Sequence, residues 1–446
     1  MRKKSTVDLT QGVIWKQLLL FALPLLASSF IQQLYNTVDL LFVGNFIGKN
    51  ASAAVGASSL LITCLVGFFS GMSVGSGVVM SQQVGARSEE GIRKTLHTAV
   101  ALSFAGGILL TILGYIGAPL FLKWMNTPEE IIASAVSYVR IYFLSLTSVI
   151  TYNIGSGVIR ATGNSSAPML IQLMGGITNV IMDAVFVVWF ENGIDGVAWA
   201  TLISQTTSAA LALVYLFRQK GAYHLNFRKL KIYGTVLKEI IRVGIPAGIQ
   251  SLVITLSNVF AQYHINGFNV DAIAAFTAYF KVELPIYLPI VAFGQAITIF
   301  SGQNIGAKNE ERMRKGTRTC ILMGIFITLI MMGIMLLFGR QAFRLFNKDE
   351  EVIAYGLRII RISFPFYWVY VILEVLAASI RGAGKSVPPM AIILTNICIV
   401  RTLLLFVIMS FYHDVRGIAL TYPITWGLTA VCMCLYYRYG KFVPHK

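Results

Sequence analysis

Twelve long apolar segments follow one another along this chain and restrict its fold more than any other feature. A helix needs about 20 mostly apolar residues to cross a bilayer, and each segment meets that length. The apolar runs are continuous instead of alternating, which excludes a β-barrel. Charged residues make up only 12% of the chain, half the usual share of about 25% in a soluble domain. We therefore predict an all-α integral membrane protein, with spans at 15–43, 54–80, 94–117, 130–154, 165–189, 195–217, 238–263, 272–300, 315–338, 352–379, 388–410 and 416–437.

The basic residues predict the orientation of these spans. With an even number of spans, both termini lie on one side, and most lysines and arginines fall on that side. Cytoplasmic loops carry the excess of basic residues, so we expect both termini in the cytoplasm and the protein in the plasma (inner) membrane. The net charge of +17 is then explained by basic residues along the cytoplasmic edge of the protein. The opposite loops hold only Lys49, Lys123, Arg340, Arg344, Lys348 and Arg416.

The second half of the chain repeats the first. Residues 84–87 (VGAR) recur as residues 305–308 (IGAK), a shift of 221 that also relates many isolated residues. We predict an N-terminal six-helix lobe at 1–217, a cytoplasmic linker at 218–237 and a C-terminal six-helix lobe at 238–446. Because six is even, the repeat is parallel, with a pseudo-twofold axis along the membrane normal. Parallel repeats of this kind are typical of transporters that alternate access to a site near the lobe interface.

Several other classes of function find no support in the sequence. Nucleic-acid binding would need a basic stripe with interleaved aromatics or a known module. No enzyme motif is present, so we expect no enzyme, no cofactor and no metal site. Without a P-loop, transport would use an ion gradient. The five cysteines lie in or beside apolar segments and are interpreted as small core residues: Cys64, Cys320, Cys398, Cys432 and Cys434.

Acidic residues inside spans are costly and therefore informative. Asp39 shares a helical face with Tyr35 and Gln32, while Asp183 shares one with Asn179. Both acids belong to the N-terminal half, and we interpret them as one polar site that binds and releases a proton, or a cation in its place. The alternative is a hydrogen bond that only packs two helices together.

For several other unusual residues in the spans, the sequence is compatible with a structural role and with a functional one. Glu283 is followed by prolines and is explained equally by a kinked helix, an ion pair with Lys281 or a binding site. Glu374 lies near the inner end of its span, and Arg401 is a candidate to neutralise one of the acids. Gly67, Gly71 and Gly75 recur every four residues, a spacing that lets helices approach closely. Pro24 and its repeat partner Pro246 predict kinks.

Several motifs together resemble the multidrug and toxic compound extrusion (MATE) family, most closely its DinF-like bacterial branch. They are residues 34–39 (LYNTVD) with 42–44 (FVG), residues 81–86 (SQQVGA) with their repeat at 302–307 (GQNIGA), and the loops at 160–164 (RATGN) and 381–384 (RGAG). The resemblance covers essentially the whole chain. It implies a bacterial antiporter that exports amphipathic, often cationic, compounds in exchange for protons or sodium.

The resemblance also implies which residues form the site. The ion-coupling positions carried over from the family are Asp39, Asn179, Asp183 and Thr201, and Pro24 corresponds to a proline linked to bending of the first span. The NorM-type branch places acids on the seventh and tenth spans, where this chain has Gln250, Asn258, a shifted Glu374 and Tyr370. We therefore expect coupling through Asp39 and Asp183, with protons favoured over sodium. The substrate-binding candidates are Gln32, Tyr35, Asn36, Tyr138, Asn153, Asn258 and Glu283.

The function expected from the sequence is thus a secondary active exporter of small amphipathic molecules that works as a monomer among membrane lipids. Two alternatives stay open. A lipid-linked oligosaccharide flippase of the same superfamily would be favoured by fourteen spans and a more cationic cavity. A membrane-embedded enzyme would need its acids without depending on any ion gradient.

Overall fold

The structure, a computed structural model, describes residues 7–47, 49–125, 127–412 and 414–440, and in this part of the chain it contains helices and turns but no strands. Twelve helical segments are long and apolar enough to cross a membrane, which confirms the predicted fold class. Their positions agree with the prediction except at the eighth span. The span predicted at 272–300 contains a helix break at Glu283, because Pro285 cannot continue the helix, and the membrane-length helix there is Leu284–Gly306.

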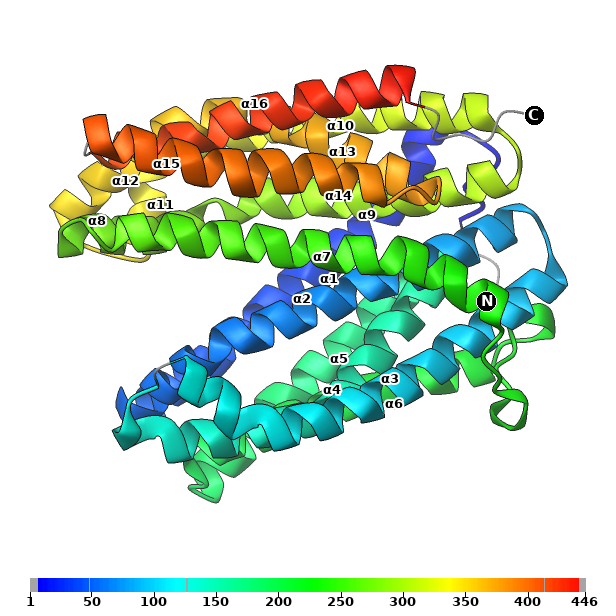
Figure 1. Cartoon of the computed structure of the whole chain (residues 1–446), viewed down its shortest axis with the longest axis horizontal. Helices are drawn as coiled ribbons and strands as arrows, with labels where there is room; N and C mark the ends of the chain where they lie inside the picture. The colour runs from blue at the N-terminus through cyan, green and yellow to red at the C-terminus, as the bar shows by residue number, and fades with distance from the viewer. Residues whose placement is uncertain (1–6, 48, 126, 413, 441–446) are drawn as a thin grey trace. The chain divides into compact units, whose positions relative to one another are not determined.

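The first repeat contains six long helices, which Figure 1 labels in chain order. They are α1 (Ile14–Phe42), α2 (Lys49–Gly85), α3 (Glu89–Trp124), α4 (Glu129–Ala161), α5 (Ser166–Asp183) and α6 (Gly193–Phe217). Two π-helical segments extend α1 and α5, namely η1 (Val43–Ile47) and η2 (Ala184–Trp189). The 3-10 turns η3 (Gly221–Tyr223) and η4 (Phe227–Lys229) follow α6.

The second repeat is divided into more pieces. Its helices are α7 (Gly234–Ile265), α8 (Val270–Val282), α9 (Leu284–Gly306), α10 (Glu310–Leu337), α11 (Gly339–Arg344), α12 (Glu350–Ser363), α13 (Tyr367–Gly382), α14 (Val387–Ile393), α15 (Arg401–Phe411) and α16 (Val415–Tyr439). A 3-10 turn, η5 (Phe364–Phe366), separates α12 from α13, and a π-helical segment, η6 (Leu394–Val400), separates α14 from α15.

The backbone repeats at the shift expected from the sequence. Helices α3 and α10 begin 221 residues apart, at Glu89 and Glu310, as do α4 and α12 at Glu129 and Glu350. The turns before and after these helices repeat too. Arg87 and Lys308 have φ values of 54° and 57°, and Gly163 and Gly384 both have 85°. A positive φ is rare outside glycine, so the matching turns are strong evidence for a structural repeat.

The chain forms two compact units that differ from the predicted lobes. Unit 1 comprises Met1–Asp8 and Leu23–Gly248, and unit 2 comprises Leu9–Ala22 and Ile249–Lys446. The chain therefore changes unit inside α1 and α7, close to Pro24 and Pro246, and the whole segment 218–237 belongs to unit 1. The predicted linker at 218–237 separates the two sequence repeats, and this division stays a prediction.

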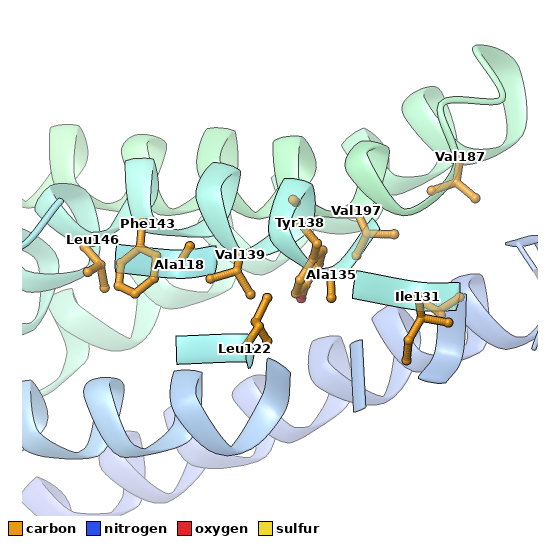
Figure 2. Packing of buried hydrophobic residues seen from close by; sticks show 12 residues of the cluster. Ala118, Leu122, Ile131, Ala135, Tyr138, Val139, Phe143, Leu146, Val187 and Val197 are labelled. Atoms are coloured by element: carbon orange, nitrogen blue, oxygen red, sulfur yellow. The ribbon is translucent and has the colours of Figure 1, made fainter. Parts of the chain in front are cut away.

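Helix α4 lies at the centre of unit 1 and packs against α2, α3, α5 and α6. One of its faces is buried at helical spacing, which places an apolar stripe against the neighbouring helices (Figure 2). Close helix packing extends to α2, where an alanine Cβ at Gly71 would lie 2.2 Å from the backbone nitrogen of Gly248. The equivalent contact at Gly75 is 2.5 Å, to the carbonyl oxygen of Ile240. The glycine spacing therefore serves packing at these two positions, as the sequence indicated.

Unit 2 has a similar centre in α13, which packs against α9, α10 and α16. Buried hydroxyl groups join three of these helices. The Ser379 hydroxyl on α13 lies 3.1 Å from that of Ser301 on α9 and 2.7 Å from that of Thr317 on α10. Small hydroxyl side chains let helices approach closely and still satisfy their polar atoms.

Candidate functional site

Two carboxyl groups meet inside unit 1. Asp39 lies near the end of α1, and Asp183 is the last residue of α5. The Asp39 carboxyl interacts with the side chains of both Asp183 and Asn179, which lies one turn before Asp183. Asp183 is fully buried and Asn179 is 2% exposed. The structure thus brings together three of the four residues expected to couple an ion.

No basic side chain neutralises this pair in the part of the chain that the structure describes, because every ion pair found there involves other acids. One oxygen of Asp39, both oxygens of Asp183 and the amide oxygen of Asn179 are buried without a well-formed hydrogen bond to the described residues. Two neighbouring carboxylates repel each other, so such a pair favours binding a proton or a cation. The π-helical segment η2 begins directly after Asp183, and π-bulges often occur at functional sites.

Aromatic side chains surround the carboxyl pair. Tyr138 on α4 is 7% exposed and lies within electrostatic range of both aspartates (Figure 2 labels it). Tyr35 lies close to Asp39 on α1, and its hydroxyl accepts a hydrogen bond of 3.2 Å from the amide of Gln172 on α5. Gln172 was not anticipated from the sequence, although it lies two turns before Asn179 on the same helix. These rings give the polar site an amphipathic wall.

The remaining candidates in unit 1 have other contacts or are exposed. Gln32 contacts Tyr35 and extends the same face of α1, whereas Asn36 is exposed. The Thr201 hydroxyl donates to the Val197 carbonyl of its own helix at 3.0 Å. The Asn153 amide likewise donates within its helix, to the carbonyl of Val149 at 2.8 Å. Pro24 lies within α1, next to the residue at which the chain changes unit.

Unit 2 contains the other two candidates, in different settings. Asn258 is exposed on α7. Glu283 lies between α8 and α9, where its carboxylate accepts a hydrogen bond from the hydroxyl of Tyr367 and also interacts with Tyr279. Tyr367 begins α13 directly after the turn η5, so the two broken spans of this repeat meet at their breaks. A kink explains Glu283 better than an ion pair with Lys281, which is exposed.

An aromatic cluster surrounds this junction and was missed by the sequence reasoning. The ring centroids of Tyr367 and Trp426 are 4.8 Å apart, and those of Tyr279 and Phe364 are 5.9 Å apart. All four side chains are buried. The two X-Pro steps at Pro285 and Pro365 were the available signal, since proline ends helices and such breaks often mark polar sites in transporters.

Arg401 does not neutralise an acid among the described residues, contrary to expectation. Its guanidinium instead donates to the Thr425 hydroxyl at 3.2 Å and lies 4.6 Å from the ring centre of Tyr422. Glu374 has a different basic partner. Arg381, two helical turns further along α13, pairs with Glu374 at 3.0 Å and also donates to Gln250 at 3.0 Å.

Comparison with known proteins places this chain in a family. The family model described as MatE matches residues 24–185 and again residues 246–407. A Bacillus subtilis (strain 168) protein named "Probable multidrug resistance protein YoeA" is 28% identical over 443 residues, covering 97% of this chain and 95% of its own. "Multidrug export protein MepA" of Staphylococcus aureus (strain MSSA476) is 21% identical, covering 87% of this chain and 86% of its own.

Solved structures share the fold as well. The structure titled "Outward-facing conformation of a multidrug resistance MATE family transporter of the MOP superfamily" superimposes with a TM-score of 0.91, covers 98% of both chains and is 22% identical. At this identity the likeness concerns the fold alone. The two matches of the family model, by contrast, span most of the chain, and the second begins 222 residues after the first, within one residue of the interval between equivalent helices. The chain belongs to the MatE family and is accordingly a multi-pass membrane transporter, related to multidrug resistance proteins, and not an enzyme.

Proposed function

We propose that this protein is a secondary active antiporter that exports amphipathic, often cationic, drugs or metabolites in exchange for protons. The observation that carries the proposal is the pair of the fully buried Asp183 and the half-buried Asp39 in unit 1, which has no basic partner among the described residues. The names of the relatives support a drug as the transported molecule. The carboxyl pair supplies the coupling step.

The coupling step uses competition for one site. When both carboxyl groups are ionised, their charges attract a cationic compound, and the rings of Tyr35 and Tyr138 contact its apolar part. When a proton binds the pair, the negative charge falls and the compound is released. Proton binding from the outer side and proton release to the cytoplasm would then drive export by alternating access. Pro24 is the proposed hinge, since proline weakens α1 where a bend is needed.

Sodium is the alternative coupling ion, because a carboxyl pair with a nearby amide oxygen also offers ligands to a small cation. Protons are favoured because the pair needs only one proton to remove its internal repulsion. We further propose that both termini lie on the cytoplasmic side of the inner membrane, because most basic residues fall on that side. The protein is proposed to work as a monomer.

The experiment is dye efflux from proteoliposomes under an imposed pH gradient and, separately, an imposed sodium gradient. Wild type should export a cationic dye under the pH gradient. Asp39→Asn should abolish this gradient-driven efflux, because the variant can no longer change charge at that position. Asp183→Asn should do the same. Glu239→Gln is the matched control, since Glu239 is an exposed acid at the start of α7, and its efflux should equal wild type.

The outcomes separate the alternatives. Efflux that follows sodium and is lost in Asp39→Asn would keep the site and change the ion. Efflux that survives both aspartate variants would refute coupling through this pair. A well-folded wild type that moves no cationic dye under either gradient would contradict the substrate class and would direct attention to lipid-linked substrates.

A further inference from the structure

The segment that joins the two repeats has a defined structure. After α6 ends at Phe217, the chain makes the turns η3 and η4 before α7 starts at Gly234. Leu225 is completely buried and its N–H donates to the carbonyl of Leu216 at 3.2 Å. The His224 ring donates to the carbonyl of Phe217 at 2.8 Å. We refer to residues 218–233 as the linker.

Helix α3 holds the linker in place at two points. The N–H of Asn226 donates to the Nε2 atom of His97 at 3.3 Å, while the other ring nitrogen of His97 donates to the carbonyl of Arg93 at 2.8 Å. The N–H of Tyr233 donates to the hydroxyl of Thr98 at 3.2 Å. His97 and Thr98 are buried, so the linker has a fixed position on unit 1.

The outer side of this fixed segment is strongly basic. The linker contains no acidic residue. Among the described residues, none of its lysines or arginines takes part in an ion pair. The five basic side chains are all exposed, and they are Arg218, Lys220, Arg228, Lys229 and Lys231. A short segment between two membrane-spanning helices does not need five exposed basic residues to stay soluble.

Apolar side chains accompany the charges. Phe227 is 45% exposed, and its ring stacks at 6.2 Å on that of Phe217, which is 51% exposed at the end of α6. Ile232 is exposed too. The linker connects the ends of two membrane-spanning segments, so it lies where the bilayer meets water. Exposed rings among basic residues are typical of elements that bind the interfacial region of a membrane.

We propose that the linker is a docking surface for anionic phospholipid headgroups, with Arg228, Lys229 and Lys231 binding the phosphates and Phe227 inserted beside them. A lipid surface is the partner favoured by position, because the headgroups are already next to the span ends. Headgroup phosphates also supply the negative charge that the linker lacks. Because the linker connects the two repeats, lipid bound there would hold this connection at the membrane surface. The proposal concerns the membrane and does not depend on which compound is transported.

Hydrogen exchange of the whole protein in nanodiscs tests the proposal. Amides of the linker should exchange more slowly in phosphatidylglycerol discs than in phosphatidylcholine discs. The difference should disappear in the triple variant Arg228→Gln, Lys229→Gln, Lys231→Gln. In detergent, the affinity of that variant for short-chain phosphatidylglycerol, titrated by native mass spectrometry, should fall about ten- to a hundredfold at low salt.

Two further variants make the result specific. Arg87→Gln, Lys308→Gln, Lys315→Gln removes the same charge from exposed positions outside the linker and should keep the lipid-dependent protection. Arg228→Lys, Lys229→Arg, Lys231→Arg keeps the charge and should also keep it, which separates lost charge from a misfolded linker. Equal exchange of the wild-type linker in both lipids would overturn the proposal. So would an equal loss of protection in the control outside the linker.

Discussion

Replacing Gly71 by alanine tests the helix packing of unit 1 most directly. The new Cβ would lie 2.2 Å from the nitrogen and 2.4 Å from the Cα of Gly248 on α7, and 2.6 Å from the carbonyl carbon of Ala247. Carbon atoms in contact are about 3.5–4.0 Å apart, so the two helices must separate locally by roughly 1 Å. All three neighbours are backbone atoms, and no rotamer change can relieve the clash.

The expected cost follows from two opposing terms. Overpacking costs about 1–3 kcal/mol, and the upper end applies here because the backbone itself must move. An alanine in place of glycine within a helix recovers up to about 1 kcal/mol. We therefore expect Gly71→Ala to reduce the free energy of unfolding by about 2 kcal/mol. The matched control is Gly106→Ala on α3, where nothing lies within 4 Å of the added Cβ, so stability should be unchanged or slightly higher.

The assay is thermal unfolding of the purified protein in detergent, with the remaining monodisperse protein measured by size-exclusion chromatography. Gly71→Ala should melt at a clearly lower temperature than wild type, and Gly106→Ala should not. Gly248→Ala should resemble Gly71→Ala, since its Cβ would lie 2.8 Å from the carbonyl oxygen of Phe68. If Gly71→Ala melts with wild type, the close approach of α2 and α7 is wrong.

Two further predictions concern the polar contacts of unit 2. Arg312→Gln should speed hydrogen exchange in residues 9–17 at least about tenfold. The reason is that the Arg312 guanidinium donates to the carbonyls of Gln11 and Gly12 at 2.8 and 3.0 Å. Arg318→Gln, which changes an exposed arginine, is the control. Asp414→Ala should destabilise unit 2 by about 1 kcal/mol, because its carboxylate accepts from the Arg416 N–H and caps α16. Partial burial would raise the pKa of the Asp414 carboxyl, but its bonds to Arg416 outweigh this effect and lower the pKa. The stabilisation by Asp414 is therefore present above the ordinary carboxyl pKa and is lost as the pH falls through the lowered pKa of the folded protein. An acid unfolding profile that is identical in Asp414→Ala and wild type would contradict this.

The spans and the repeat could be predicted because they depend on local or periodic signals. A helix of sufficient apolar length has few alternatives in a membrane, and a shift of 221 residues is visible in the sequence itself. The turn at Arg87 and Lys308 illustrates this, since the same short motif produces the same positive φ twice. The length argument did not reveal the helix breaks at Glu283 and at Phe364–Phe366, because an apolar run can continue through a break beside a proline.

Contacts between distant segments were less accessible. The approach of Asp39 to Asp183 was inferred through the family resemblance and the cost of burying acids, not from any property of the two segments alone. The bond between Glu283 and Tyr367 was not inferred at all, because it depends on two helix breaks facing each other. Arg401 was a candidate to neutralise an acid, and its hydroxyl and aromatic partners were not foreseen, since a buried guanidinium can be satisfied by these groups as well as by an acid.

Comparing equivalent positions of the two repeats shows where function has diverged from fold. At the shifts of 222 and 221, the partners of Asp39 and Asp183 in the second repeat are Ala261 and Leu404, neither of which can bind a proton. The reverse holds for Glu283, whose partner in the first repeat is Ile62.

Turns and helix starts kept the repeat, because the backbone needs them in both copies. The acids Asp39, Asp183 and Glu283 did not keep it. If both repeats coupled to ions in the same way, the acids would recur at the same shift as the turns. Their absence at those positions is the reason to expect that coupling runs through unit 1 alone. Glu283, with its tyrosine partner at the helix breaks, would then have a separate role in unit 2.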